Sequence, residues 1–305
     1  MIEDNTSVIA RKKRRPNERK DGQRPKDERR QDSRPFLVIP YWSEGPTSDG
    51  DNGSIRPLPP AIQPGVVYYA CPSIQTSPYV PGQPLTVTVE VGNFGGANTP
   101  SLAQVTVWWS EPTTGFVIEP GKLIGFQSIP VEPRRRSPSR PMTKVIPSDA
   151  PDHICLLARV SHQYDRAGSV ADPINDRHWA QRNLSVVAVK GQLSVELDFF
   201  AGNPLKHAGN FVLEVRELSP ERLRFLGEEL QCKSVSSFGH ARLVKNEREA
   251  DNQIGVELEP AERRRVQLQV EMAQPLARGQ FSAVEIIQRH GKILVGALAV
   301  AIVGE

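Results

Sequence analysis

Hydrophobic side chains recur at every second position in most apolar segments of this 305-residue chain, and this period constrains the fold more than any other feature. Residues 85–91, Leu-Thr-Val-Thr-Val-Glu-Val, alternate apolar and polar side chains, and residues 103–109 repeat the pattern. Because side chains of a strand point alternately to opposite faces, such segments form strands with one face on a core. Further candidate strands are residues 122–131, 142–146, 153–161, 193–200, 210–218, 254–258, 265–271, 281–288 and 292–303.

Only one clear helix start is present. Ser219 is a good N-cap, Pro220 suits the first helical position and Gly227 can end the helix. So short a helix is expected to connect strands rather than to form a layer. Many strands with turn signals and almost no amphipathic helix predict an all-β chain with two tandem immunoglobulin-like antiparallel β-sandwiches.

The composition divides the chain into four parts. Residues 1–35 contain twelve Lys and Arg against seven Asp and Glu, whereas the whole chain has a net charge of only +3. We expect these residues to be a disordered basic arm. Residues 36–65 form a Pro-rich linker with a short apolar anchor, and the sandwiches are expected at residues 66–190 and 191–305.

The basic character of the arm is densest in one run, Arg11, Lys12, Lys13, Arg14 and Arg15. Acidic residues are interleaved after this run, which favours a solvated electrostatic tether. The sharper alternative is an arm that docks residues 11–34 on nucleic acid or another acidic surface.

One stretch resembles a known family. Residues 81–96, Pro-Gly-Gln-Pro-Leu-Thr-Val-Thr-Val-Glu-Val-Gly-Asn-Phe-Gly-Gly, are similar to the first half of a CARDB-type module, the bacterial immunoglobulin-like "cell adhesion related" domain. Residues 105–109 match its second strand, and residues 155–160 and 175–184 resemble its closing strands. The resemblance covers roughly residues 66–190 and implies a β-sandwich used for display, spacing or adhesion.

No catalytic or cofactor motif is present. The sequence lacks a Gly-rich phosphate loop, a Gly-x-Ser-x-Gly elbow, a His-Glu-x-x-His pair and a Cys-x-x-Cys pair, so we expect neither an enzyme nor a cofactor. Three cysteines are too few for a disulfide framework. Cys155 lies in an apolar strand, where a buried inert thiol is expected.

Two groups of polar residues were considered as metal ligands. Asp172, Asn175 and Asp176 offer hard oxygen atoms for Ca²⁺, but their spacing is not that of the known calcium loop, and capping of turns is favoured. Three histidines, His153, His162 and His178, are too widely spaced to place two ligands on one face of an element.

The residues predicted to bind a partner are aromatic and basic. Trp108 and Trp109 must point to opposite faces of one strand, and an outward Trp109 beside Arg134, Arg135 and Arg136 would form a hot spot. The equal alternative is a Trp shielded by its own Pro-rich loop. The apolar anchor supplies a second candidate surface with Phe36, Tyr41 and Trp42.

The C-terminal residues 293–303 are apolar on both faces of a strand. They predict a final strand buried between a sandwich core and an adjacent surface, or an exposed assembly edge. No run of apolar residues reaches the roughly 18 that a membrane-spanning helix needs.

These observations predict a non-enzymatic structural or interaction protein that presents β-sandwich modules for protein–protein binding or assembly. The alternatives are a protein bound to nucleic acid or an acidic surface through its arm, and an accessory module of a surface hydrolase or a phage-like particle. The acidic first residues and the missing apolar stretch are unlike a secretory signal, so a cytoplasmic protein or a component of an assembled particle is expected, with export by a route without a signal peptide as the alternative.

Overall fold

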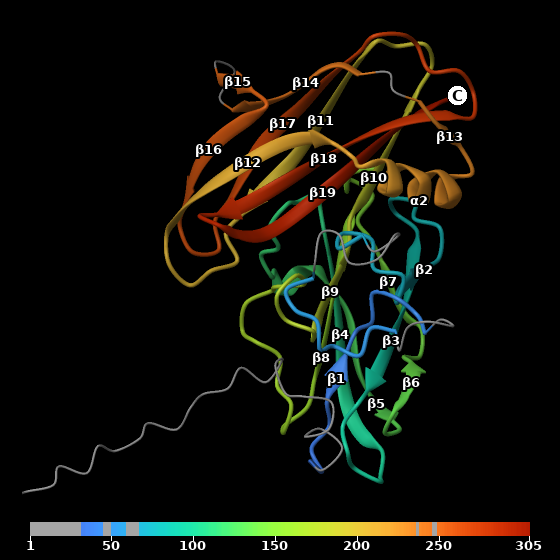
Figure 1. Cartoon of the computed structure of the whole chain (residues 1–305), viewed down its shortest axis with the longest axis vertical. Coiled ribbons are helices and arrows are strands. Elements are labelled where there is room, and N and C mark those ends of the chain that lie inside the picture. The colour runs from blue at the N-terminus through green and yellow to red at the C-terminus, as the bar shows by residue number, and fades with distance from the viewer. Residues whose placement is uncertain (1–31, 45–49, 59–66, 236–237, 246–248) are drawn as a thin grey trace, which may run out of the picture.

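The computed structural model describes residues 32–44, 50–58, 67–235, 238–245 and 249–305, and the basic run at residues 11–15 lies outside them. Strands dominate, and they form two β-sandwiches, the second placed above the first in Figure 1. The fold class predicted from the alternating pattern, all-β with antiparallel sandwiches, is therefore confirmed.

The first sandwich has two antiparallel sheets. In one sheet the central strand is β3 (Pro84–Asn93). β1 (Leu37–Val38) and β6 (Arg135–Pro138) both pair with Gly92 and Asn93 at the end of β3, so they lie on opposite sides of it. The strands of this sheet are β1 (Leu37–Val38), β2 (Ile74–Thr76), β3 (Pro84–Asn93), β6 (Arg135–Pro138) and β7 (Met142–Val145). The other sheet has the order β5 (Leu123–Val131), β4 (Ser101–Ser110), β8 (Cys155–Ser161) and β9 (Trp179–Arg182).

The alternation seen in the sequence is what packs these sheets together. Val87, Val89 and Val91 of β3 are fully buried, as are Val105 and Val107 of β4, and all five belong to one hydrophobic cluster. The polar residues between them lie on the outer faces, as expected for strands that cover a core on one side.

The second sandwich has longer strands. One sheet has the order β10 (Leu184–Val189), β19 (Ile293–Gly304), β18 (Gln280–His290), β12 (Gly209–Glu217) and β16 (Gln253–Leu258), and β13 (Lys233–Ser234) adds to β18. The other has the order β11 (Ser194–Gly202), β17 (Arg263–Met272), β14 (Phe238–Lys245) and β15 (Glu249–Asp251). Pairing is antiparallel except between β10 and β19 and between β13 and β18.

The predicted helix start is confirmed. In α2 (Pro220–Leu230) the Ser219 hydroxyl accepts a hydrogen bond from the Arg222 N–H. The helix passes Gly227 and ends three residues beyond it at Leu230, followed by Gln231 in the left-handed conformation at φ 54°. Leu226 of this helix packs on Phe281 of β18, so α2 covers the end of a sheet and forms no layer of its own.

The segment expected to be a linker, residues 36–65, packs on the first sandwich wherever it is described. Phe36, Leu37 and Ile39 are buried, and the Tyr41 hydroxyl donates a hydrogen bond to the Tyr68 carbonyl. Further along, the Leu58 N–H donates to the carbonyl of Ile174 at 2.7 Å. These residues fill the open side of the sandwich instead of spacing it from the arm.

The chain crosses from the first sandwich to the second at Asn183, which is buried. Asn183 is fully buried, and its side-chain amide donates to the carbonyls of Thr113 and Ala297, one in each sandwich. The next strand, β10, already pairs with β19 of the second sandwich. The sandwiches therefore meet directly at Asn183, ahead of the boundary expected at Lys190 and Gly191.

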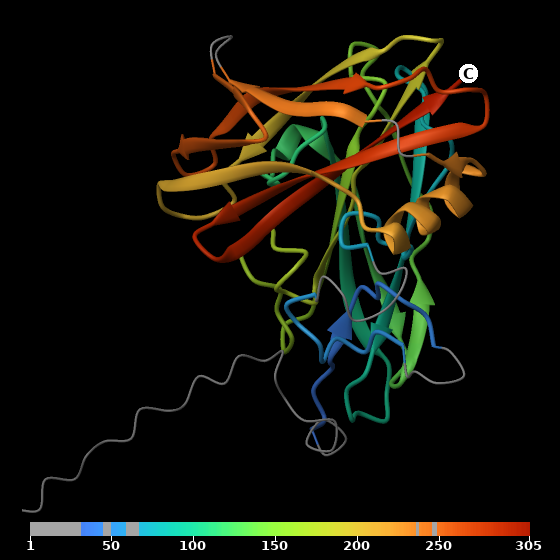
Figure 2. The ribbon, with the colours of Figure 1, turned by 45° about the horizontal axis from the view of Figure 1, so that its top comes forward.

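Backbone approaches closely where the sandwiches meet. A Cβ atom built on Gly296 would lie 1.7 Å from the Thr114 carbonyl oxygen, and one on Gly202 would lie 2.2 Å from that of Gly115. Only glycine permits such an approach. In Figure 2 the long hairpin of β18 and β19 crosses above the strands of the first sandwich.

The C-terminal apolar run fits this interface. Ala297 and Ala299 of β19 join the hydrophobic cluster of the first sandwich, whereas Leu298 and Val300 join that of the second. The strand is thus buried between a sandwich core and an adjacent surface, the first of the two alternatives that its sequence allowed.

Candidate functional site

The two adjacent tryptophans are both covered. Trp108 is 8% exposed and stacks on Trp179 at 6.0 Å between ring centroids, and Trp109 is 6% exposed with the Lys122 amine 5.3 Å above its ring. The shielded alternative is therefore the one that the structure adopts. Neither ring is free to contact a partner.

Trp109 also lies far from the arginines with which it was expected to act. In the ladder between β4 and β5, Ser101 pairs with Val131 and Trp108 pairs with Leu123. Arg134 comes three residues after Val131, at one end of the ladder, whereas Trp109 comes directly after Trp108, at the other end. The expectation of a joint Trp109–arginine surface is corrected by this register.

The aromatic anchor is likewise mostly internal. Phe36 is 1% exposed and Tyr41 is 2% exposed, so both stabilise the fold and neither offers a contact surface. Trp42 is half-buried against the core of the first sandwich. Of the three predicted anchor residues, only Trp42 has side-chain surface for a partner.

The structure brings Trp42 to the arginines instead. Arg135 and Arg136 belong to β6, and Arg134 precedes this strand at φ 60°. One amine of the Arg136 guanidinium donates to the Trp42 carbonyl at 3.0 Å, and another forms an ion pair with Glu90 at 3.3 Å. Arg136 is thereby held in place beside Trp42.

A shallow hollow of about 450 Å³ opens at this point, lined by Ser43, Glu44, Glu90, Arg134, Arg135 and Arg136. Arg134 and Arg135 are exposed, and within the described residues neither guanidinium forms an ion pair. We call these four residues, Trp42 and Arg134 to Arg136, the arginine surface.

The N-terminal sequence joins the fold at the same end of the molecule. Asp32 accepts a hydrogen bond from the Gly96 N–H at 3.0 Å through its backbone carbonyl, and its carboxylate pairs with Arg34 at 2.7 Å. A few residues later, Leu37 pairs with Asn93 from the side opposite to Arg135. Residues 32–37 and β6 are therefore both attached near the Asn93 end of β3.

The most strongly buried charges form a structural cluster. Asp165 accepts a hydrogen bond from the Leu37 N–H at 2.6 Å and forms an ion pair with Arg177. Arg177 donates to the Leu37 carbonyl at 3.0 Å, and its guanidinium lies 3.8 Å from the centroid of the Phe36 ring. This Asp165–Arg177 cluster fastens β1 to the loop between β8 and β9.

His178 completes the cluster between two carboxylates. Burial alone would lower its pKa, but hydrogen bonds with Asp165 and Asp176 outweigh this effect and raise it. Burial would raise the pKa of Asp165, yet the hydrogen bond from His178 and the charge of Arg177 hold it below its usual range. These groups contact one another and the backbone of Leu37, so they stabilise the fold at this point.

The possible calcium ligands close turns of their own loop. The Asp172 carboxylate accepts two hydrogen bonds from Asn175, at 3.0 Å from its N–H and 2.7 Å from its side-chain amide. Asp176 accepts from the Gly168 N–H at 2.7 Å and contacts His178 at 2.6 Å. Within the described residues, no three His, Cys, Asp or Glu side chains are grouped to hold a metal ion.

Two of the three cysteines, Cys71 and Cys155, are buried. Cys155 is fully buried, and this burial raises its pKa to about 12. Burial raises the pKa of Cys71 to about 12 as well. Because the thiolate is the nucleophile, a thiol with such a pKa is unreactive at neutral pH. The prediction of an inert Cys155 is confirmed.

Comparisons with known proteins give no functional assignment. No family model matches the sequence, and no curated protein matches it. Among solved structures, a putative carbohydrate binding protein from Bacteroides ovatus is 5% identical, with 40% of this chain and 35% of that one covered and a TM-score of 0.31. The CupB6 tip adhesin from Pseudomonas aeruginosa is 8% identical over 75% of this chain and 92% of that one, with a TM-score of 0.22.

A red sea bream transglutaminase is 14% identical, with 76% of this chain and 31% of that one covered and a TM-score of 0.21. The chain thus spans about a third of the length of the Bacteroides protein and of the transglutaminase. At these TM-scores none of the three bears on what the chain does. Within the described residues, no helix has the length and apolar character to cross a membrane.

Proposed function

We propose that the chain is a non-enzymatic binding protein that uses the arginine surface to hold an acidic segment of a protein partner. The observation that carries the proposal is the pair of exposed guanidinium groups, Arg134 and Arg135, beside a third, Arg136, that is already fixed. Arginine forks bind carboxylates with two parallel hydrogen bonds, and Trp and Arg are the residues that most often dominate protein interfaces.

The charges around the hollow favour a protein over a polyanion. Glu44 and Glu90 line it together with the arginines, and a uniformly charged phosphate chain would be repelled by both. A protein segment with mixed charges can satisfy both signs. The excess of Lys and Arg in the sequence before residue 32 adds attraction for an acidic partner, as the tether hypothesis requires.

The absence of enzymatic activity belongs to the same proposal. It is supported by the engagement of Asp165, Arg177 and His178 with one another and by the burial of the Cys155 thiol. The CARDB-type resemblance of residues 66–190 fits a binding role, because such modules serve in display or adhesion.

The test uses the full chain and a fluorescent peptide rich in aspartate and glutamate. The double variant Arg134→Glu and Arg135→Glu should weaken binding about ten-fold, which corresponds to about 1.4 kcal/mol. The matched control is Arg278→Glu with Lys292→Glu, two exposed residues of the second sandwich that give the same change in net charge. Equal losses in both double variants would show that overall charge, and not the arginine surface, governs binding.

A parallel titration with single-stranded DNA distinguishes this proposal from the alternative of a nucleic-acid-binding arm. If DNA binds more tightly than the peptide and the loss follows deletion of residues 1–31 alone, the nucleic-acid hypothesis replaces this proposal.

A further inference from the structure

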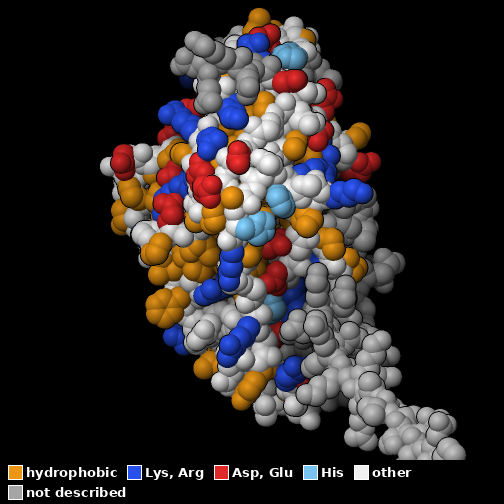
Figure 3. Space-filling model, turned by 90° about the vertical axis from the view of Figure 1, so that its left-hand side faces the viewer, with side chains coloured by type: hydrophobic (Ala, Val, Ile, Leu, Met, Phe, Trp, Pro, Cys, Tyr) orange, Lys and Arg blue, Asp and Glu red, His pale blue; other side chains and the backbone are white. Residues whose placement is uncertain are grey.

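A second hollow lies between the two sandwiches, on the left-hand side of the view in Figure 1, where the connection between β11 and β12 comes down toward the first sandwich. Its volume is about 390 Å³, within the range of about 300–1,000 Å³ typical of small-molecule sites. Figure 3 faces this side and shows hydrophobic side chains next to Lys and Arg side chains at mid-height. We call this hollow the inter-sandwich pocket.

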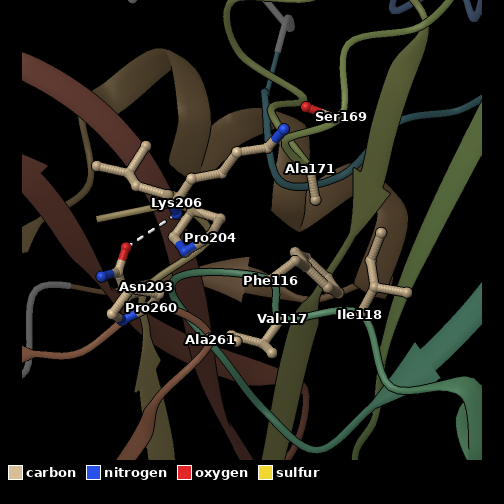
Figure 4. Close-up of a pocket in the computed structure, with 11 residues that line it drawn as sticks. Phe116, Val117, Ile118, Ser169, Ala171, Asn203, Pro204, Lys206, Pro260 and Ala261 are labelled. Atoms are coloured by element: carbon tan, nitrogen blue, oxygen red, sulfur yellow. Dashed lines mark hydrogen bonds between the residues drawn. The ribbon is translucent and has the colours of Figure 1, made fainter. Parts of the chain in front are cut away.

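Both sandwiches supply its walls. Phe116, Val117 and Ile118 come from the connection after β4, and Ala171 from the loop between β8 and β9. The opposite wall consists of the β11–β12 connection and the turn between β16 and β17, with Asn203, Pro204, Leu205, Lys206, Pro260 and Ala261 (Figure 4). The lining is mainly apolar, so it favours a hydrophobic ligand body.

The second-sandwich wall is fixed by buried hydrogen bonds. Asn203 is fully buried, and its side-chain amide donates to the carbonyls of Leu258 and Glu259 while its oxygen accepts from the Leu205 N–H. Ala261 is held at φ 60°, a conformation that residues other than glycine rarely adopt, and its N–H donates to the Asn203 carbonyl. A wall held in this way needs little reorganisation when a ligand enters.

One charge faces this apolar space. Lys206 is the only charged residue of the lining, it is exposed, and within the described residues its amine forms no ion pair. In Figure 4 its side chain extends over the pocket toward Ser169. Two carboxylates next to lining residues in the sequence already have arginine partners, Glu119 with Arg263 and Glu262 with Arg264. A Lys amine beside an apolar surface pairs best with an anion that carries an apolar body.

We propose that the inter-sandwich pocket binds a small organic carboxylate with an aliphatic or aromatic body. The carboxylate pairs with the Lys206 amine and accepts a hydrogen bond from the Ser169 hydroxyl at the mouth. The apolar body packs against Phe116, Pro204 and Pro260 in the interior. Because the walls belong to both sandwiches, the ligand also stabilises the contact between them.

The test is a calorimetric titration of the full chain with octanoate and, as an uncharged match, octanamide. We expect saturable binding of one octanoate per chain, with octanamide about ten-fold weaker. Lys206→Gln should weaken the binding of octanoate about ten-fold and leave the binding of octanamide unchanged. Lys292→Gln, an exposed lysine elsewhere on the second sandwich, is the control and should bind octanoate like the wild type.

A charge-reversal variant of Lys206 tests the proposal even if octanoate binds weakly. Lys206→Glu should reverse the preference, so that octylammonium binds better than octanoate. Octanoate binding that does not saturate, or that is equal in the wild type and Lys206→Gln, would overturn the proposal. The arginine surface is not involved, and its double variant should bind octanoate normally.

Discussion

The first sandwich is closed by a two-residue strand and a loop that are held by buried charges, whereas the second is closed by its own long strands. In the first, residues 36–41 and the loop between β8 and β9 cover the open side, and the buried ion pair of Asp165 with Arg177 holds them. In the second, β17 and β18 bury apolar residues such as Leu268 and Ile286, and the space between the sheets contains one hydrophobic cluster. Its buried carboxylate, Glu285, instead faces the first sandwich, where it meets Arg222 and Tyr68.

This difference predicts which kinds of change destabilise each sandwich. Ionic closure depends on every partner being present and correctly charged, because removal of one leaves the others buried without compensation. Apolar closure depends on volume and is insensitive to pH. All four tryptophans, Trp42, Trp108, Trp109 and Trp179, lie on segments of the first sandwich. Two of them, Trp108 and Trp179, also belong to the hydrophobic cluster of the second sandwich, so tryptophan fluorescence reports on the first sandwich and on its contact with the second.

The largest expected effect is the loss of the ionic closure. Asp165→Ala should lower the free energy of unfolding by about 3–5 kcal/mol, because Arg177 loses its buried ion pair and His178 keeps only one of its two carboxylates, Asp176. Urea unfolding followed by tryptophan fluorescence measures this loss. Asp198→Ala is the control, since Asp198 pairs with Arg265 on the exposed face of the second sandwich and should change little. Similar losses in both variants would contradict the comparison.

The next effect concerns the contact between the halves. Gly296→Ala places a methyl group against the Thr114 carbonyl and should destabilise the chain by about 1–3 kcal/mol. We expect fluorescence and circular dichroism to give one unfolding midpoint in the wild type and two in this variant. Gly255→Ala, where a Cβ atom meets nothing within 4 Å, is the matched control. A single midpoint in both variants would show that the close approach does not couple the sandwiches.

A smaller effect is expected from pH. The depressed pKa of Asp165 gives stability that is present above its unfolded value of about 4 and is lost as the pH falls through the folded value. The raised pKa of His178 gives stability that is present below its unfolded value of about 6.5 and is lost as the pH rises through the folded value. Urea unfolding of the wild type and His178→Gln should therefore differ more at about pH 5.5 than at about pH 8. The reverse order would mean that His178 is neutral in the fold.

The smallest effect is expected at α2, the one α-helix within the described residues. Ser219→Ala removes the N-cap of α2 and should cost about 0.5–1 kcal/mol, because the hydrogen bond to the Arg222 N–H is long at 3.5 Å. The change should appear in circular dichroism and leave the tryptophan signal of the first sandwich at the wild-type midpoint. Loss of both signals together would indicate that α2 supports the whole molecule through Arg222 and Glu285.

Local patterns were sufficient for the regular strands. Residues 85–91 and 103–109, which the alternating pattern predicts to be strands, lie in β3 and β4. β14 was missed because a bulge between Phe238 and His240 shifts the register and breaks the period of two. β1 has only two residues, and its pairing with β3 depends on Asn93, far away in the sequence.

The candidate sites were less accessible to sequence analysis. The arginines were recognised from their composition, but the register of β4 and β5 decided that Trp42 and not Trp109 accompanies them. The inter-sandwich pocket was missed entirely, because it forms only when four distant connections meet. Pro204 and Pro260 mark two of those connections as turns, but a turn residue alone does not indicate a ligand site.

The parallel pairing of β10 with β19 has a mechanical consequence. β10 is attached to the first sandwich at its Leu184 end, and β19 finishes at Gly304 beside Val189. Tension between the first sandwich and the C-terminus therefore pulls these neighbours along their length in opposite directions. The hydrogen bonds between β10 and β19 are therefore loaded together, in shear, and do not break one after another.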